Sequence, residues 1–296
     1  MRIDRASLSR CLELKLHAGA PAISQHQGNR RSPQRGRGVE FADYRTYDPG
    51  DDIRLVDWNV YLRLGIALVK QFTEERSLTL RVCVDTSESM SFGAPKRKCD
   101  QAAELAAALS MVALGQREPV TLVCAGGAPK SSRARAVNLD GMADLIMLLE
   151  RTEPAGLGDI RKGIVTQLGV SRSDRLVLLS DLLMEDAERT DLLRACAASC
   201  HDMTVIHVLG PDELSPVLDD VMRVVDSETG QELVIPGGAR KDYQKALDAW
   251  LGSIEAECKR LAITYLRVPT ADTIEQVLLR GLYRARVVEH RIGATP

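Results

Sequence analysis

The chain has 296 residues, of which 45% are hydrophobic and 27% are charged, and its formal net charge is −2. These values are typical of a soluble globular protein of one or two domains, and they exclude a general nucleic-acid binder and a membrane-surface protein. No run approaches the roughly 18 apolar residues of a membrane span, and residues 1–10 lack the apolar core of a signal peptide. Together with seven cysteines that form no Cys-x-x-Cys pair, this predicts a reduced, cytoplasmic protein.

The beginning of the chain contains two stretches of different composition. Leu8, Cys11, Leu12 and Leu16 have the spacing of one helix face. A stretch rich in Arg, Gly and Pro follows at residues 25–38 and predicts a loop. Its arginines suit a solvated loop or pairing with acidic groups of the same fold. The alternative is a nucleic-acid arm, which the absence of interleaved aromatic residues disfavours.

Residues 39–76 contain six of the chain's eleven aromatic residues. Within them, residues 48–51 read Asp-Pro-Gly-Asp, which predicts a β-turn because Pro fixes φ and Gly tolerates positive φ. The acidic cluster around this turn lacks the spacing of a calcium-binding EF-hand loop, and arginines lie nearby. A structural, ion-paired turn is therefore favoured. Its acids are Asp48, Asp51, Asp52 and Asp57, and its arginines are Arg45, Arg54 and Arg63.

From residue 78 onward, apolar strand-like runs alternate with helical patterns. Such alternation predicts an α/β fold with a doubly wound, mostly parallel sheet and right-handed crossovers. A hairpin at residues 221–235 is inserted into the series. The expected strands are 78–84, 120–126, 133–137 (a sheet edge), 174–183, 203–210 and 263–268, and the expected helices are 99–116, 140–150, 158–169, 186–199, 240–262 and 272–284.

Oxygen-bearing side chains follow the first of these strands at every second position. Asp85, Ser87 and Ser89 can therefore converge on one side of an extended loop. Hard oxygen ligands with few charges suit Mg²⁺, which keeps part of its shell for water or another ligand. The alternative for Asp85 is a turn aspartate.

A second carboxylate, Asp181, lies at the carboxyl end of a later buried strand. Ligands of open α/β sheets bind beyond the carboxyl ends of the strands, so Asp85 and Asp181 would line one crevice if their strands are neighbours. The alternative for Asp181 is a helix N-cap.

Other chemistries fit the sequence less well. It contains no dinucleotide-binding Gly-x-Gly-x-x-Gly, no P-loop and no Gly-x-Ser-x-Gly nucleophile motif. His207 lies within a strand and is expected to be a core histidine. A metal-dependent phosphohydrolase that uses Asp85 as nucleophile is the remaining enzymatic alternative, although Ser87 replaces the acid that general acid–base catalysis would need two positions later.

The run Asp-Thr-Ser-Glu-Ser-Met at residues 85–90 resembles the Asp-x-Ser-x-Ser motif of the metal-ion-dependent adhesion site (MIDAS) of von Willebrand factor A (vWA) domains. The stretch at residues 36–76 is similar to the signature of the bacterial family called Domain of Unknown Function 58. Later segments fit it too, and the resemblance covers residues 8–285. It implies a vWA-like, Rossmann-type domain at 78–285, an N-terminal signature segment at 1–77 that packs on it, and a tail at 286–296.

The resemblance also implies a function and a set of ligands. Members of the family are associated with a MoxR-type AAA+ ATPase and are thought to act with it as adaptors in protein assembly or in metal or cofactor insertion, without an established catalytic activity. The client protein is not identified by the sequence. Gly158 stands where the adhesion site has threonine, and Asp159 could substitute. The metal ligands that the resemblance implies are Asp85, Ser87, Ser89 and Asp181.

Overall fold

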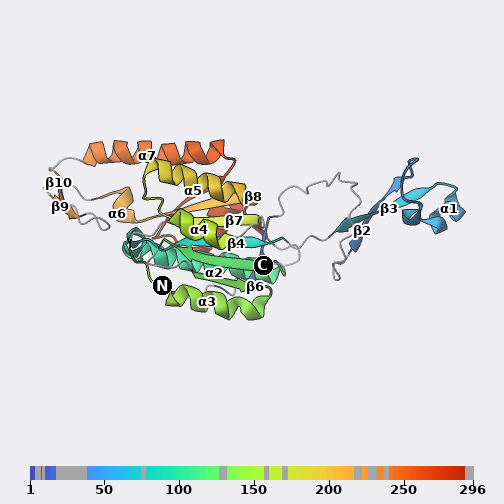
Figure 1. Ribbon diagram of the computed structural model, residues 1–296, viewed down its shortest axis with the longest axis horizontal. Coiled ribbons are helices and arrows are strands. Elements are labelled where there is room, and N and C mark those ends of the chain that lie inside the picture. Colours follow the sequence, from blue (N-terminus) through green and yellow to red (C-terminus); the bar gives the residue numbers. More distant parts are fainter. Residues whose placement is uncertain are drawn as a thin grey trace. The chain divides into compact units, whose positions relative to one another are not determined.

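The structure is a computed structural model (Figure 1). It describes residues 1–3, 8, 11–17, 39–74, 78–126, 132–156, 160–168, 173–216, 222–225, 232–235 and 240–290. The chain divides into two compact units. The larger unit comprises Met1–Pro21 and Leu78–Pro296, and the smaller unit is Ala22–Ser77. The division into a segment at 1–77, a domain at 78–285 and a tail stays a prediction.

A six-stranded sheet forms the centre of the larger unit. Neighbouring strands are parallel except for the pair at one edge, β5 and β6. The two central strands, β4 and β7, are buried along nearly their whole length because both faces of a parallel sheet are covered. In spatial order the strands are β11 (Thr264–Pro269), β8 (Cys200–Leu209), β7 (Ser173–Ser180), β4 (Leu80–Asp85), β5 (Val120–Ala125) and β6 (Ser132–Ala136).

Helices cover both faces of this sheet, and each face has its own hydrophobic core (Figure 1). One core is formed with α2 (Lys98–Gly115), α3 (Met142–Arg151), α8 (Ile274–Gln276) and the π-helix η5 (Val277–Leu282). The other is formed with α4 (Ile160–Leu168), α5 (Asp186–Ala198) and α7 (Arg240–Arg260). The predicted α/β class with a mostly parallel, doubly wound sheet is thereby confirmed.

The helix α2 is apolar around most of its circumference. A surface helix has one apolar stripe, whereas a helix that is apolar all round is buried. Fifteen of its eighteen residues are buried, because the sheet covers one side while β1 (Leu14–Leu16) and α3 lie against others. The first residue of this buried helix is a lysine, Lys98.

The interpretation of Leu8, Cys11, Leu12 and Leu16 as one helix face is wrong at Leu16, although Leu8 and residues 11–13 are 3₁₀-helical. Leu14–Leu16 forms the strand β1, which pairs antiparallel with β12 (Val288–His290) near the other end of the chain. The ion pair of Lys15 with Glu289, 3.1 Å long, supports this pairing. Apolar spacing over so few residues does not distinguish a helix from a short strand whose partner is far away in sequence.

Shorter elements complete the larger unit. β9 (Met222–Val225) and β10 (Glu232–Ile235) form the antiparallel hairpin predicted at 221–235. The turns are η3 (Glu88–Ser91), η4 (Leu139–Gly141) and α6 (Pro211–Leu214). No helix formed by the described residues is both long and apolar enough to cross a membrane.

The smaller unit is an antiparallel hairpin of β2 (Val39–Thr46) and β3 (Leu68–Glu74), with η2 (Ile53–Leu55) and α1 (Trp58–Leu64) between the strands. Arg45 pairs with Asp51 at 2.5 Å, so the ion-paired interpretation of the turn is confirmed for these two residues. Asp57 caps α1. The arginines at 30–37 lie outside the described residues.

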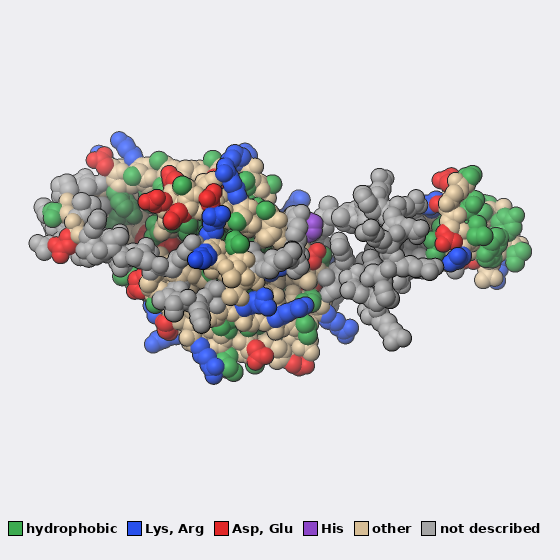
Figure 2. All heavy atoms as spheres, viewed as in Figure 1, with side chains coloured by type: hydrophobic (Ala, Val, Ile, Leu, Met, Phe, Trp, Pro, Cys, Tyr) green, Lys and Arg blue, Asp and Glu red, His purple; other side chains and the backbone are tan. Residues whose placement is uncertain are grey.

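Large apolar side chains are exposed on this smaller unit (Figure 2). Leu62 is 81% exposed. Val56 and Val69 are the buried apolar residues among those of this unit whose side chains the structure describes. The other exposed apolar side chains include Ile53, Leu55, Trp58, Tyr61, Leu64 and Ile66.

Candidate functional site

The carboxyl ends of β4 and β7 lie side by side. The two strands are hydrogen-bonded neighbours with Val84 opposite Leu179. Asp85 is the last residue of β4, and Asp181 directly follows the end of β7. The structure therefore brings the two predicted carboxylates to the same edge of the sheet, and both are 1% exposed.

Asp85 is held by hydrogen bonds from two sides. Its Oδ1 accepts from the backbone N–H of Ser87 at 2.9 Å, and its Oδ2 accepts from the Ser180 hydroxyl at 2.5 Å. Burial, and secondly the negative charge of Asp181, raise the pKa of Asp85 to about 7. No Lys or Arg of the described residues forms an ion pair with it. Asp85 is thus a buried carboxylate without a positively charged ion-pair partner among the described residues.

The two serines lie as their spacing predicted. The hydroxyls of Ser87 and Ser89 are 3.0 Å apart. Ser87 is at the N-terminal end of η3, and the side chain of Met90 within η3 is fully buried, so it anchors this turn in the core. Asp85, Ser87 and Ser89 therefore place three oxygen-bearing side chains in one tight turn.

A glycine that sequence reasoning missed makes room for this turn. Gly126, which follows β5, has φ of +109°, and a Cβ at this position would lie 2.8 Å from Oδ1 of Asp85. A side chain would meet both the carboxylate and a strained backbone conformation. The neighbouring strand thus needs glycine where it passes Asp85, and the sequence signal was a glycine directly after a buried strand.

The chain leaves β7 through a strained residue. Leu182 has φ of +53°, an uncommon conformation for a branched apolar residue, and its side chain is fully buried. Its N–H donates to the Ser180 hydroxyl at 2.9 Å, so Ser180 bonds both Asp85 and this bend. Strain of this kind is concentrated at functional sites, where the surrounding structure enforces it.

Lys98 is the site residue that the sequence did not reveal. Its Nζ lies 2.7 Å from Oδ2 of Asp181 and 2.5 Å from Oε1 of Glu213, and its side chain is 1% exposed. Burial alone favours the neutral amine, but the carboxylates of Asp181 and Glu213 prevail and raise the pKa of Lys98. The Lys98 ammonium therefore occupies the position beside Asp181 that a metal ion bound to this carboxylate would need.

His207 supports the same aspartate from the neighbouring strand. Its ring nitrogens lie 2.7 Å from the backbone oxygen of Asp181 and 2.7 Å from the hydroxyl of Tyr265. It is fully buried, and burial lowers its pKa to about 4. The prediction of a satisfied core histidine is confirmed.

The loop after α3 approaches the Asp85 turn. The N–H of Ala155 donates to the oxygen of Thr86 at 3.2 Å, and that of Gly156 donates to Glu88 at 3.3 Å. This loop leads to Gly158 and Asp159, which lie outside the described residues. Their predicted part in the metal shell therefore stays a prediction.

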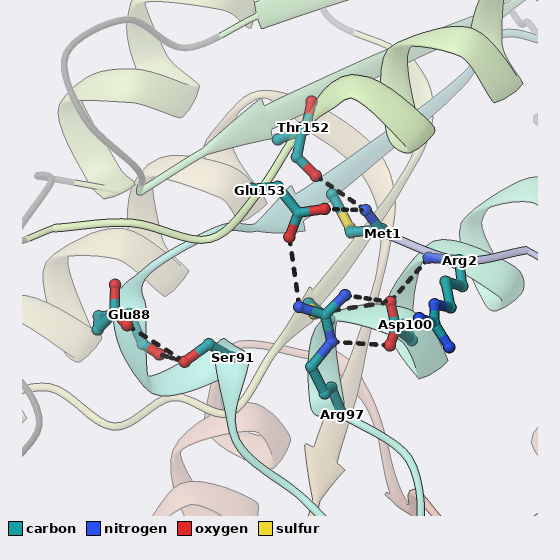
Figure 3. A network of polar contacts seen from close by, with 9 residues as sticks. Met1, Arg2, Glu88, Ser91, Arg97, Asp100, Thr152 and Glu153 are labelled. Carbon is teal, nitrogen blue, oxygen red and sulfur yellow. Dashed lines mark hydrogen bonds and ion pairs between the residues drawn. The ribbon is translucent and has the colours of Figure 1, made fainter.

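A polar network fixes the same loop to the start of α2 (Figure 3). Arg97 bonds Asp100 at 2.9 Å and Glu153 at 3.3 Å. The amino group of Met1 bonds Glu153 at 3.0 Å and the oxygen of Thr152 at 3.1 Å. These contacts hold the residue before Lys98 in place, so Lys98 enters the site from a fixed helix end.

The donor set fits a hard divalent cation in part. Two buried carboxylates and two hydroxyls are oxygen donors of the type that Mg²⁺ takes. The described residues contain no cluster of three or more His, Cys, Asp and Glu side chains of the kind that holds a metal by itself. Asp85, Ser87 and Ser89 would hold such an ion, whereas Asp181 is already paired with Lys98.

The fold and this turn define an α/β protein with buried carboxylates and hydroxyls at the carboxyl ends of its central parallel strands. Residues 43–249 match the family described as "Protein of unknown function DUF58". This match covers more than half of the chain, so the chain belongs to this family.

Related sequences agree with this membership. Uncharacterized proteins of Mycobacterium tuberculosis and Mycobacterium bovis are 32% identical to the chain over 222 residues. The alignment covers 72% of this chain and 69% of each of those proteins.

Three solved structures align with the chain at low sequence identity. The conserved hypothetical protein BatB from Bacteroides thetaiotaomicron is 14% identical, with a TM-score of 0.43 over 70% of this chain and 98% of that one. An aerotolerance-related membrane protein from Bacteroides fragilis is 14% identical, with a TM-score of 0.39 over 70% and 99%. An uncharacterized membrane-spanning protein from Vibrio fischeri has a TM-score of 0.22 at 14% identity over 68% and 96%.

The prediction of a cytoplasmic location is wrong as an inference. Two of the similar structures are titled as membrane proteins. The absence of a membrane-length apolar run does not by itself assign a compartment. The error came from treating hydropathy as evidence of location.

Proposed function

We propose that this protein is a non-enzymatic interaction module of the vWA type. Asp85, Ser87 and Ser89 bind Mg²⁺ at an adhesion-type site, and the ion keeps an open position for a carboxylate of a partner protein. The observation that carries the proposal is the pair of serine hydroxyls, 3.0 Å apart, next to a buried aspartate without a compensating charge. A divalent cation would supply that charge.

Asp181 completes the proposed shell from the neighbouring strand. Its pairing with Lys98 makes metal binding weak, because the ion and the ammonium compete for one carboxylate. Gly158 in place of the threonine removes a further ligand, for which water or Asp159 would substitute.

The partner proposed from the family resemblance is a MoxR-type AAA+ ATPase, with which the module would act in protein assembly or in metal or cofactor insertion on a client protein. A metal-bridged carboxylate makes such an association conditional on the ion. The partner's contribution would be an exposed Asp or Glu.

Isothermal titration of the purified chain with Mg²⁺, and then with the ATPase in Mg²⁺ or EDTA, tests the proposal. Asp85→Ala is expected to abolish both binding events. Asp144→Ala is the matched control, since Asp144 is exposed on α3 and outside the site. Unchanged ATPase affinity in Asp85→Ala would refute the metal-bridged contact.

The alternative, a metal-dependent phosphohydrolase, has less support. A phosphohydrolase with Asp85 as nucleophile would need a general acid or base two positions later, and Ser87 stands there instead. A phosphatase screen with and without Mg²⁺ distinguishes the two functions: turnover that Asp85→Asn abolishes would favour the enzyme.

A further inference from the structure

The strand β11 is one of the two edge strands of the six-stranded sheet. It pairs with β8 on one side and with no other strand of the described residues. An edge strand presents a row of unpaired N–H and C=O groups, to which an extended segment can add as a further strand. β11 has six residues, or about 20 Å of backbone at ~3.3 Å per residue.

A groove of about 510 Å³ runs along this edge. Its strand side consists of Leu266, Arg267 and Val268. Consecutive side chains of a strand point to opposite faces. Three consecutive residues can therefore line one groove only where the groove follows the backbone edge of the strand. The helical side consists of residues 276–277, 280–281 and 284–285, which recur every four positions and form one stripe.

The helical wall lies close to the strand. Gly281 belongs to η5, and a Cβ at this position would lie 3.1 Å from the Leu266 side chain. Val277 and Leu282 of the same helix are buried in the core and fix it there. π-helical turns are rare and are frequently found at functional sites. The groove is therefore bounded by a rigid helix on one side and a free strand edge on the other.

The charge of the groove is positive. Arg267, Arg280 and Arg284 line it together with one acid, Asp272. Arg267 is paired with Glu255 at 2.8 Å. Arg280 and Arg284 are exposed and form no ion pair with a described residue. They leave two uncompensated positive charges along the helical wall.

We propose that this groove binds an extended acidic segment of a partner protein. The segment adds to β11 as a seventh strand, and its carboxylates lie against Arg280 and Arg284. Backbone hydrogen bonds to an edge strand supply affinity in this mode of recognition, while side chains facing the groove supply specificity. The volume is within the range of about 300 to 1,000 Å³ that ligand sites have. This site is independent of the one at Asp85.

Fluorescence anisotropy with a labelled hexapeptide of alternating glutamate and valine tests the proposal on the full chain. Saturable binding is expected, and the double variant Arg280→Glu/Arg284→Glu is expected to weaken it at least tenfold. Both arginines are exposed, so the fold should tolerate the change. Arg135→Glu is the matched control, because Arg135 is an exposed arginine on the opposite edge strand, β6. The Arg135→Glu variant should bind the peptide with the same affinity as the unaltered chain.

A second peptide separates strand addition from simple attraction of charge. The same hexapeptide with every backbone amide N-methylated keeps its charges but has no N–H to donate to an edge strand, and its binding is expected to be lost. The proposal would be overturned if the methylated peptide bound as tightly as the unmethylated one. It would also be overturned if Arg135→Glu weakened binding as much as the double variant, or if no saturable binding were seen. Dimerisation of the free chain that the double variant abolishes would also overturn it, since the occupant would then be a second copy.

Discussion

Replacing Lys98 by methionine is the sharpest perturbation of the site, because it removes one charge while nearly conserving the side-chain volume. The variant leaves Asp181, which is 1% exposed, without its ion-pair partner and close to Asp85. Removing one partner of a buried ion pair costs about 3 to 5 kcal/mol, since the other charge stays buried and uncompensated. We expect Lys98→Met to lower the free energy of unfolding by this amount in EDTA.

The same variant reports on metal binding. Mg²⁺ can neutralise the two carboxylates once the ammonium is gone, so it is expected to bind Lys98→Met more tightly than the unaltered chain. An ion that binds only the folded state stabilises it by about 2.7 kcal/mol at a hundredfold excess over Kd. Urea unfolding by circular dichroism, in EDTA and in a Mg²⁺ series, measures both effects.

Lys96→Met is the control for this experiment. Lys96 pairs with Glu104 at 2.5 Å near the start of α2, but its side chain is 27% exposed. Partly exposed pairs contribute about 0 to 1 kcal/mol. The reasoning is refuted if Lys98→Met costs no more than Lys96→Met, or if Mg²⁺ stabilises the unaltered chain as much as Lys98→Met.

Three further outcomes follow from described residues. Gly126→Ala should lower the free energy of unfolding by about 1 to 3 kcal/mol, because φ is positive at this position and the new Cβ would overlap with Asp85. Gly252→Ala should raise the free energy of unfolding by about 0.5 to 1 kcal/mol, because the space around Gly252 is open. Chemical denaturation measures both changes. Burial raises the pKa of Glu118 from 4.5 to about 7 against the attraction of Arg175. The folded state therefore holds this proton more tightly, and the free energy of unfolding should fall by up to about 3 kcal/mol as pH rises from 4.5 to 7. The Glu118→Gln variant is expected to lack this pH-dependent part of the free energy of unfolding between pH 4.5 and 7. An unchanged slope of the free energy of unfolding against pH would contradict the assignment. All seven cysteines are buried, and burial raises the pKa of Cys196 to about 12. A thiol reagent such as Ellman's should react with none in the native protein and with seven in guanidinium, and fast native labelling would contradict this.

Hydrophobic pattern was sufficient to predict the centre of the fold. Runs such as the one ending at Asp85 are buried on both faces, and such strands are recognisable without knowledge of their partners. The rule that ligand sites lie beyond the carboxyl ends of parallel strands puts Asp85 and Asp181 in one crevice only if their strands are neighbours, and the structure supplies that adjacency. The pattern of buried strands therefore carried most of what could be predicted of the site.

Contacts between residues far apart in sequence could not be predicted in this way. Lys98 lies among Lys96 and Arg97, a run that looks like a solvated basic turn, and its partner Asp181 is 83 residues away. The pairing of β1 with β12 joins residues over 270 positions apart, and a three-residue strand has no recognisable period. In both cases the decisive interaction depends on the completed fold.

The exposed apolar side chains of the smaller unit have a consequence for how the protein can be handled. Contiguous apolar surface of this kind marks an interaction site or an aggregation hazard. A two-stranded hairpin with few buried apolar residues is also marginally stable in isolation. A fragment limited to Ala22–Ser77 should therefore precipitate or be cleaved by proteases, and should require detergent or a fusion partner to stay in solution.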